Sequence, residues 1–229
     1  MRTCLLAIVL VVASPGCSSD SCKIDPTYDP VVDPASFVAA VDNPLYPLVP
    51  GTRYDYQNGA EHVTTTVTTD RKVVLGVTCT VVHDTSMVNG QLVEDTYDWF
   101  AQDRDGNVWY MGEDTSQLSN GSVVGHDGSW EGGVAGAKPG IVMPAVRRIM
   151  QPYRQEYRPC EAEDQGEVLA VDASVTVPAG SFTGCVLTKD FSELEPDVVE
   201  NKYYCPGVGL ALTIDLSNGE REELIGKTP

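Results

Sequence analysis

The chain has 229 residues, of which 33 are acidic and 15 are basic, so its formal net charge is −18 at pH 7. Without residues 1–16, whose only charged side chain is Arg2, the balance is 33 acidic against 14 basic side chains, or about −19. Nucleic acids and anionic membrane surfaces are polyanions, so this charge argues against both as partners. Roughly 180 residues follow the N-terminal leader, which suits one domain.

The N-terminus has the form of a bacterial secretory signal. Arg2 supplies a positive charge, an apolar run covers residues 4–13, and Ser14-Pro15-Gly16 ends that run. The run is too short to cross a membrane, which takes roughly 20 apolar residues. We therefore predict a signal peptide over residues 1–16 and an exported protein at the cell envelope, whether outer membrane, periplasm or cell surface.

The residues before Cys17 resemble the bacterial lipobox, in which a small residue precedes a cysteine that becomes the diacylated N-terminus. The resemblance implies a membrane anchor on Cys17. Ser14 stands where lipoboxes usually have Leu, and the alternative is ordinary cleavage nearby with Cys17 in a disulfide. Prolines alternate with aspartates along residues 17–46, which predicts a flexible leader ahead of a single β-rich domain over residues 47–229.

Hydrophobic periodicity predicts an all-β fold. Apolar and β-branched residues alternate with polar ones, as along residues 62–68, and no helical stripe appears. Tight-turn dipeptides separate the strands: Asn89-Gly90, Asp105-Gly106, Asn120-Gly121 and Asn218-Gly219. The prediction is an antiparallel meander that forms a curved sheet or partial barrel. Residues 128–144 are expected to form a long Gly-rich loop, with a short helical turn over residues 145–150.

Five cysteines follow Cys17, and none forms a C-x-x-C pair. In an oxidising compartment they indicate disulfides. Strands expected over residues 182–191 and 201–205 fold back about residue 195 and place Cys185 opposite Cys205, so we predict that disulfide. Cys79 with Cys160 is the next pairing to expect, and the partner of Cys22 stays open.

Four segments together resemble a family of uncharacterised secreted bacterial lipoproteins. Residues 47–54 are similar to the family's PL-x-x-G-x-x-W/Y opening, residues 175–182 to its VPAGTF motif, and residues 203–210 to its Y-x-APGVGLV hairpin. Residues 98–110 look like the corresponding segment of a set of actinobacterial and proteobacterial lipoproteins of unknown function. The resemblance implies an antiparallel β fold akin to periplasmic lipoprotein carriers and implies no activity.

Two acidic segments are candidate sites. Asp103, Asp105 and Asn107 offer oxygen ligands for Ca²⁺, but Gly106 and Asp114 do not fit the EF-hand spacing, and a hairpin turn explains the motif. We therefore expect neither a metal nor another cofactor. Glu161 and Glu163 could act as paired carboxylates in a hydrolase, but a solvated acidic loop is the favoured explanation in a chain this negative.

Aromatic side chains are candidates for ligand binding. Tyr97 and Trp99 share one strand face, Phe100 takes the other, and Trp109 follows in the next strand. A concave sheet lined by Tyr97, Trp99 and Trp109 could hold an apolar ligand, whereas the alternative is that these residues are core. We expect no catalytic residues and a non-enzymatic envelope lipoprotein that binds an apolar ligand or an envelope protein. The alternative is a secreted hydrolase that uses acidic residues or a Ca²⁺-assisted site.

Overall fold

A computed structural model describes residues 25–229. These residues form fifteen strands and one short 3-10 helix, η1 (Pro34–Ser36). The strands are β1 (Arg53–Asn58), β2 (Glu61–Val74), β3 (Val77–Val88), β4 (Gln91–Gln102), β5 (Val108–Ser119), β6 (Ser122–Gly125), β7 (Trp130–Glu131), β8 (Lys138–Met143), β9 (Pro152–Arg154), β10 (Glu156–Tyr157), β11 (Gln165–Val177), β12 (Gly180–Phe191), β13 (Val199–Cys205), β14 (Gly209–Asp215) and β15 (Arg221–Thr228).

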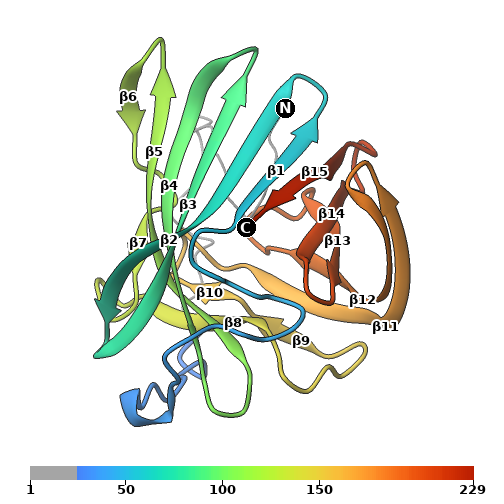
Figure 1. The fold of residues 1–229 in the computed structure, drawn as a ribbon. Coiled ribbons are helices and arrows are strands. Elements are labelled where there is room, and N and C mark those ends of the chain that lie inside the picture. Colours follow the sequence, from blue (N-terminus) through green and yellow to red (C-terminus); the bar gives the residue numbers. More distant parts are fainter. Residues whose placement is uncertain (1–24) are drawn as a thin grey trace.

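All strands belong to one open, curved, antiparallel sheet, which confirms the predicted fold class (Figure 1). Its order is β10-β8-β5-β4-β3-β2-β1-β15-β14-β13-β12-β11-β9. Two meanders, β1 to β5 and β11 to β15, are joined where β1 pairs with β15. In Figure 1 they form the two wings of the molecule.

The predicted hairpin turns explain the order within each wing. Asn89 and Gly90 both have positive φ angles, 51° and 77°, as a two-residue turn of this handedness requires. Asn120 and Gly121 repeat the arrangement at 51° and 76°. Each dipeptide reverses the chain and pairs neighbouring strands.

The inner face of the curved sheet holds the main hydrophobic core. This core contains buried residues from both wings, including Phe100 of β4, Tyr204 of β13 and Leu224 of β15. Members from strands far apart in the sheet can share one cluster because the sheet curls around it. A second, smaller cluster lies on the outer face and contains Trp99 and Met111.

Residues 17–46 were expected to be a flexible leader, but the described part of this segment, residues 25–46, packs on the sheet. Val38 N donates to the carbonyl oxygen of Gln102 in one wing, and Gly207 N donates to that of Pro44 in the other. Leu45 and Tyr46 are buried in the inner core. The segment is ordered because its apolar residues cover the core where the sheet leaves it open.

The region of residues 128–144 is not wholly a loop, as had been expected, because it contributes β7 and β8 to the sheet. Gly112 permits the approach of β7, since a Cβ there would lie 2.4 Å from the Trp130 carbonyl oxygen. Residues 145–150 form no helical turn. Within residues 25–229, no helix is long and apolar enough to cross a membrane.

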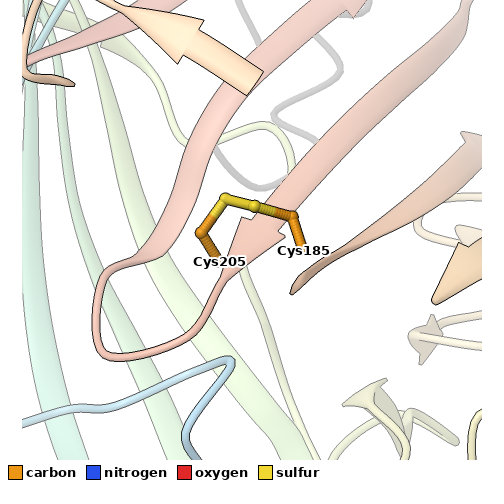
Figure 2. Close-up of a disulfide and its surroundings, with 2 residues drawn as sticks. All are labelled: Cys185 and Cys205. Atoms are coloured by element: carbon orange, nitrogen blue, oxygen red, sulfur yellow. A yellow bond between two sulfur atoms is a disulfide. The ribbon is translucent and has the colours of Figure 1, made fainter. Parts of the chain in front are cut away.

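The predicted Cys185–Cys205 disulfide is confirmed (Figure 2). Val186 pairs with Tyr204 across β12 and β13, which sets the two cysteines opposite each other with a Cα–Cα distance of 4.2 Å. The Cys79–Cys160 pairing is wrong: Cys79 is a free, buried thiol, and Cys160 is disulfide-bonded to another cysteine. Cys79 packs in the outer-face cluster beside Val77 and Trp99.

Candidate functional site

A set of buried carboxylates lies among the inner-face residues, and we call it the acidic belt. Its eight members are each less than one-tenth exposed: Asp84, Asp98, Glu113, Glu156, Asp164, Asp190, Glu200 and Glu222. They come from β3, β4, β5, β10, β12, β13 and β15, with Asp164 next to β11. Strand pairing brings members together, since Asp98 is opposite Glu113 and Asp190 is opposite Glu200.

Hydrogen bonds and one buried cation stabilise the acidic belt. The Tyr110 hydroxyl donates to Asp98 Oδ1 at 2.6 Å, and Trp130 Nε1 donates to Glu156 Oε2 at 2.8 Å. Lys202 Nζ lies 3.2 Å from Asp190 Oδ2 and 3.2 Å from Glu200 Oε2. Since one lysine faces many carboxyls, the belt cannot be neutralised by ion pairs alone.

Burial instead favours the protonated form of these carboxyls. Desolvation raises the pKa of Asp84 to about 6 and that of Asp164 to about 7. Burial, followed by the charge of Asp84, raises the pKa of Asp98 well above its ordinary value. Burial raises the pKa of Glu222 in the same way. Near neutral pH the belt therefore holds protons that an exposed carboxylate would have released.

A cavity next to the acidic belt opens between the leader and the β13–β14 turn. It has about 530 Å³ of empty space, a figure that includes the open solvent at its mouth. Three of its rings form a row: the Tyr46 ring centroid lies 5.4 Å from that of Phe100 and 5.9 Å from that of Tyr204. Tyr46 thus connects the two wings.

Two polar atoms of the cavity-lining residues are closed off from solvent. They are Asp84 Oδ1 and Thr65 Oγ1, and both are buried. A buried polar group without a partner costs about 1–3 kcal/mol. Thr65 is directly opposite Asp84 across β2 and β3, and its side chain hydrogen-bonds to Asp84, which offsets part of the cost of burying this carboxyl.

The predicted ligand-binding aromatics line neither this cavity nor the shallower one over β9. Tyr97 is 40% exposed and stacks on His83 at 4.3 Å between ring centroids. Trp99 is buried in the outer-face cluster, and Trp109 packs against that cluster. The alternation of side chains along β4 correctly predicted that Tyr97 and Trp99 share one face of the strand. The concave face of the sheet, however, is the face that holds Phe100.

The candidate Ca²⁺ ligands hold a turn together. Asp103 accepts hydrogen bonds from Asn107 N, Asn107 Nδ2 and Trp109 Nε1, at 2.9, 2.8 and 2.8 Å. Asn107 Oδ1 accepts from Ala145 N at 2.8 Å. Asp105 is exposed at the tip of the turn. These bonds explain the motif, and residues 25–229 contain no cluster of His, Cys, Asp or Glu fit to hold a metal ion.

Glu161 and Glu163 do not face each other across a cleft. Glu161 pairs with Arg158 at 2.7 Å and is half exposed, whereas Glu163 accepts a hydrogen bond from Cys160 N at 2.8 Å. Their neighbour Asp164 does belong to the acidic belt. The sequence signal for the belt was a charged residue at an inward position inside a strand, as at Asp98 between Thr96 and Phe100. Cys17, the predicted lipidation site, lies outside the described residues.

No protein-family model matches the chain, and no curated protein matches it. One solved structure, of a presumed lipoprotein from Parabacteroides distasonis, is 12% identical in sequence and superposes with a TM-score of 0.35. The match covers 80% of this chain and 98% of that one. This similarity is too low for any property of that protein to be assigned to the present chain.

Proposed function

We propose that this protein is a lipid-anchored, non-enzymatic component of the bacterial envelope that binds a small ligand in the inner cavity. The signal-like N-terminus and Cys17 support the envelope location. The observation on which ligand binding rests is the open cavity lined by the rings of Tyr46, Phe100 and Tyr204. Aromatic rings such as these would bury the apolar part of a ligand.

A hydrolase is the less favoured function because the acidic belt presents one carboxyl to the cavity. Asp84 lines the cavity, but its neighbour Asp98 does not. Asp98 Oδ1 accepts the Tyr110 hydroxyl, and Asp98 Oδ2 is buried away from solvent. Glycoside hydrolysis needs two carboxyls that both reach the substrate, about 5–10 Å apart. Asp84 alone supports recognition of a ligand better than catalysis.

Native mass spectrometry of protein purified from its own envelope tests the proposal. We expect a bound small molecule in addition to the polypeptide mass. Val208→Trp at the cavity should reduce the bound fraction, since Val208 lines the cavity and is part of the β13–β14 turn. Leu216→Trp is the matched control, because Leu216 is 51% exposed in the next hairpin.

An absence of bound material in the wild-type protein would contradict the proposal. Retention of the same material in the folded Val208→Trp variant would place the ligand elsewhere and would also contradict it. Circular dichroism of both tryptophan variants checks that the sheet is intact.

A further inference from the structure

The segment before β9 exposes apolar side chains beside two arginines, and we call residues 144–152 the apolar loop. Three of its apolar side chains are 70%, 53% and 70% exposed: Val146, Ile149 and Met150. Arg147 and Arg148 stand between them in the sequence. Arg147 donates to the Pro144 carbonyl oxygen at 3.3 Å, and neither arginine forms an ion pair within residues 25–229. Apolar side chains grouped at a surface in this way are typical of a contact with a membrane or a partner protein.

The fold holds the apolar loop at both ends. Ala145 N donates to Asn107 Oδ1 at 2.8 Å, which attaches the loop to the β4–β5 turn. Met150 N donates to the Val168 carbonyl oxygen at 2.9 Å, which attaches it to β11. Met150 has a φ angle of 60°, in the left-handed region that a methionine rarely adopts. Exposed apolar side chains on a tethered, strained backbone cost stability, and a contact outside the domain would offset that cost.

The charges at this end of the molecule favour a surface that carries phosphate groups. The apolar loop contains two arginines and no acidic residue, and the adjoining β4–β5 turn places Arg104 between Asp103 and Asp105. Loop and turn together thus carry three arginines against two aspartates, in a chain whose net charge is −18. Arginine binds phosphate oxygens through its planar fork of N–H donors. Apolar side chains next to arginines enter the boundary between lipid headgroups and acyl chains.

The predicted anchor brings this same end of the molecule to the membrane. Asp25 N donates to the Tyr157 hydroxyl oxygen at 2.6 Å, and the Asp25 side chain pairs with Arg154 at 3.3 Å. Arg154 is the last residue of β9, the strand that follows the apolar loop (Figure 1). Eight residues separate Cys17 from Asp25, and at about 3.6 Å for each the two lie within about 29 Å of each other. The β6 hairpin, which exposes Val124, lies beyond the other end of the 12-residue strand β5, roughly 35–40 Å away.

We propose that the apolar loop docks on the bilayer that holds the Cys17 anchor, with its three exposed apolar side chains at the acyl boundary and Arg147 and Arg148 on lipid phosphates. This inference rests on the lipid anchor of the proposed function. The loop alone offers a small contact, but the anchor makes that contact intramolecular and so raises its effective concentration. The two attachments together fix the orientation of the domain, with the β6 hairpin pointing away from the membrane.

Tryptophan quenching in vesicles tests the docking. The lipid-anchored protein, purified from membranes, would be reconstituted into vesicles of phosphatidylethanolamine and phosphatidylglycerol, with or without lipids brominated in the acyl chain. Met150→Trp adds a tryptophan to the apolar loop, and Val124→Trp adds one to the β6 hairpin, where Val124 is 66% exposed. After subtraction of the wild-type signal, brominated lipid should quench at least about half of the added fluorescence in Met150→Trp. It should quench less than about a tenth in Val124→Trp.

Two double variants test the arginines in the Met150→Trp background. Arg147→Gln/Arg148→Gln neutralises the arginines of the apolar loop. Arg53→Gln/Arg221→Gln neutralises two exposed arginines on β1 and β15, so it changes the net charge by the same amount. The loop variant should lower the quenching at least about twofold, and the control variant should leave it unchanged.

An unquenched Met150→Trp, or equal quenching of Met150→Trp and Val124→Trp, would overturn the docking. A loop that binds an envelope protein instead would give the first of these results in pure lipid. Quenching that Arg147→Gln/Arg148→Gln leaves unchanged would overturn the contact with phosphates. Circular dichroism checks each fold, and Val146→Trp replaces Met150→Trp if that variant does not fold.

Mass spectrometry of the same samples reports the acyl group on Cys17 separately. An unquenched loop in acylated protein overturns the docking and leaves the proposed function standing. An absence of the acyl group overturns both the anchor and the docking that depends on it.

Discussion

The acidic belt makes folding stability depend on pH in the direction opposite to that of a paired carboxylate, and Asp164 shows the effect most clearly. Burial raises the pKa of Asp164 from 3.8 to about 7. A carboxyl whose folded pKa is raised binds its proton more tightly in the folded state than in the unfolded chain. Its contribution to stability is therefore fully present below the pKa of the unfolded chain, near 4. That contribution is lost as the pH rises through the pKa of the folded protein, near 7.

The size of this loss follows from the two pKa values. Between pH 5 and pH 7 the unfolded chain has released the Asp164 proton while the folded protein retains it. Each pH unit in that window costs about 1.4 kcal/mol, so the two units together cost roughly 2–3 kcal/mol. Asp164→Asn mimics the protonated side chain at every pH. The variant should therefore lose roughly 2–3 kcal/mol less stability than the wild type over this range.

Urea unfolding at pH 5, 6, 7 and 8, followed by tryptophan fluorescence, measures the free energy of unfolding for both proteins. Asp172→Asn serves as the control, because an exposed aspartate should leave the pH dependence unchanged. If Asp164→Asn and the wild type lose stability in parallel from pH 5 to pH 7, the account of the buried proton is wrong. A wild-type protein that gains stability over this range would refute the account for the whole belt.

Three further predictions concern the disulfide, the outer-face cluster and the anchor. The double variant Cys185→Ala/Cys205→Ala removes a constraint on a loop with a sequence separation of 20 residues. It should lower the free energy of unfolding, measured in urea, by about 3 kcal/mol. An unchanged unfolding midpoint would show that the disulfide adds no stability. Trp99→Ala should cost about 3–5 kcal/mol, as for a core aromatic, and should leave the fraction of protein with bound ligand in native mass spectrometry unchanged, because Trp99 does not line the cavity. Loss of the bound ligand without a loss of stability would show that Trp99 belongs to the binding site. Mass spectrometry of the mature protein should find a diacylglyceryl group on Cys17, and an unmodified N-terminus elsewhere would rule out the anchor.

Local chemistry made the turns and the disulfide predictable. Asn89-Gly90 reverses the chain because both residues accept positive φ angles, which is a property of the dipeptide itself. The pairing of Cys185 with Cys205 follows from the same kind of reasoning, since one short connection between two strands determines their register.

The concave face could not be predicted locally. Residues 97–100 place large side chains on both faces of β4, and each face is covered by apolar residues from elsewhere. Which face becomes the interior depends on the pairing of β1 with β15 and on the packing of Tyr46, both of which join distant parts of the chain. The acidic belt was missed for the same reason, because a carboxylate in a strand ordinarily indicates the solvent side.

The pairing of β1 with β15 has a consequence for the kinetics of folding. Arg53, at the start of β1, pairs with Thr228, at the end of β15, so the two residues are 175 positions apart in the sequence. The centre of the sheet can therefore form only after β15 has been synthesised, and contacts of such high sequence separation slow folding. Until then both meanders expose an unpaired edge, which is the kind of surface that recruits other chains into aggregates. A nascent chain that stops before Arg221 would keep both edges open permanently, so premature termination should yield aggregation or degradation rather than a smaller stable domain.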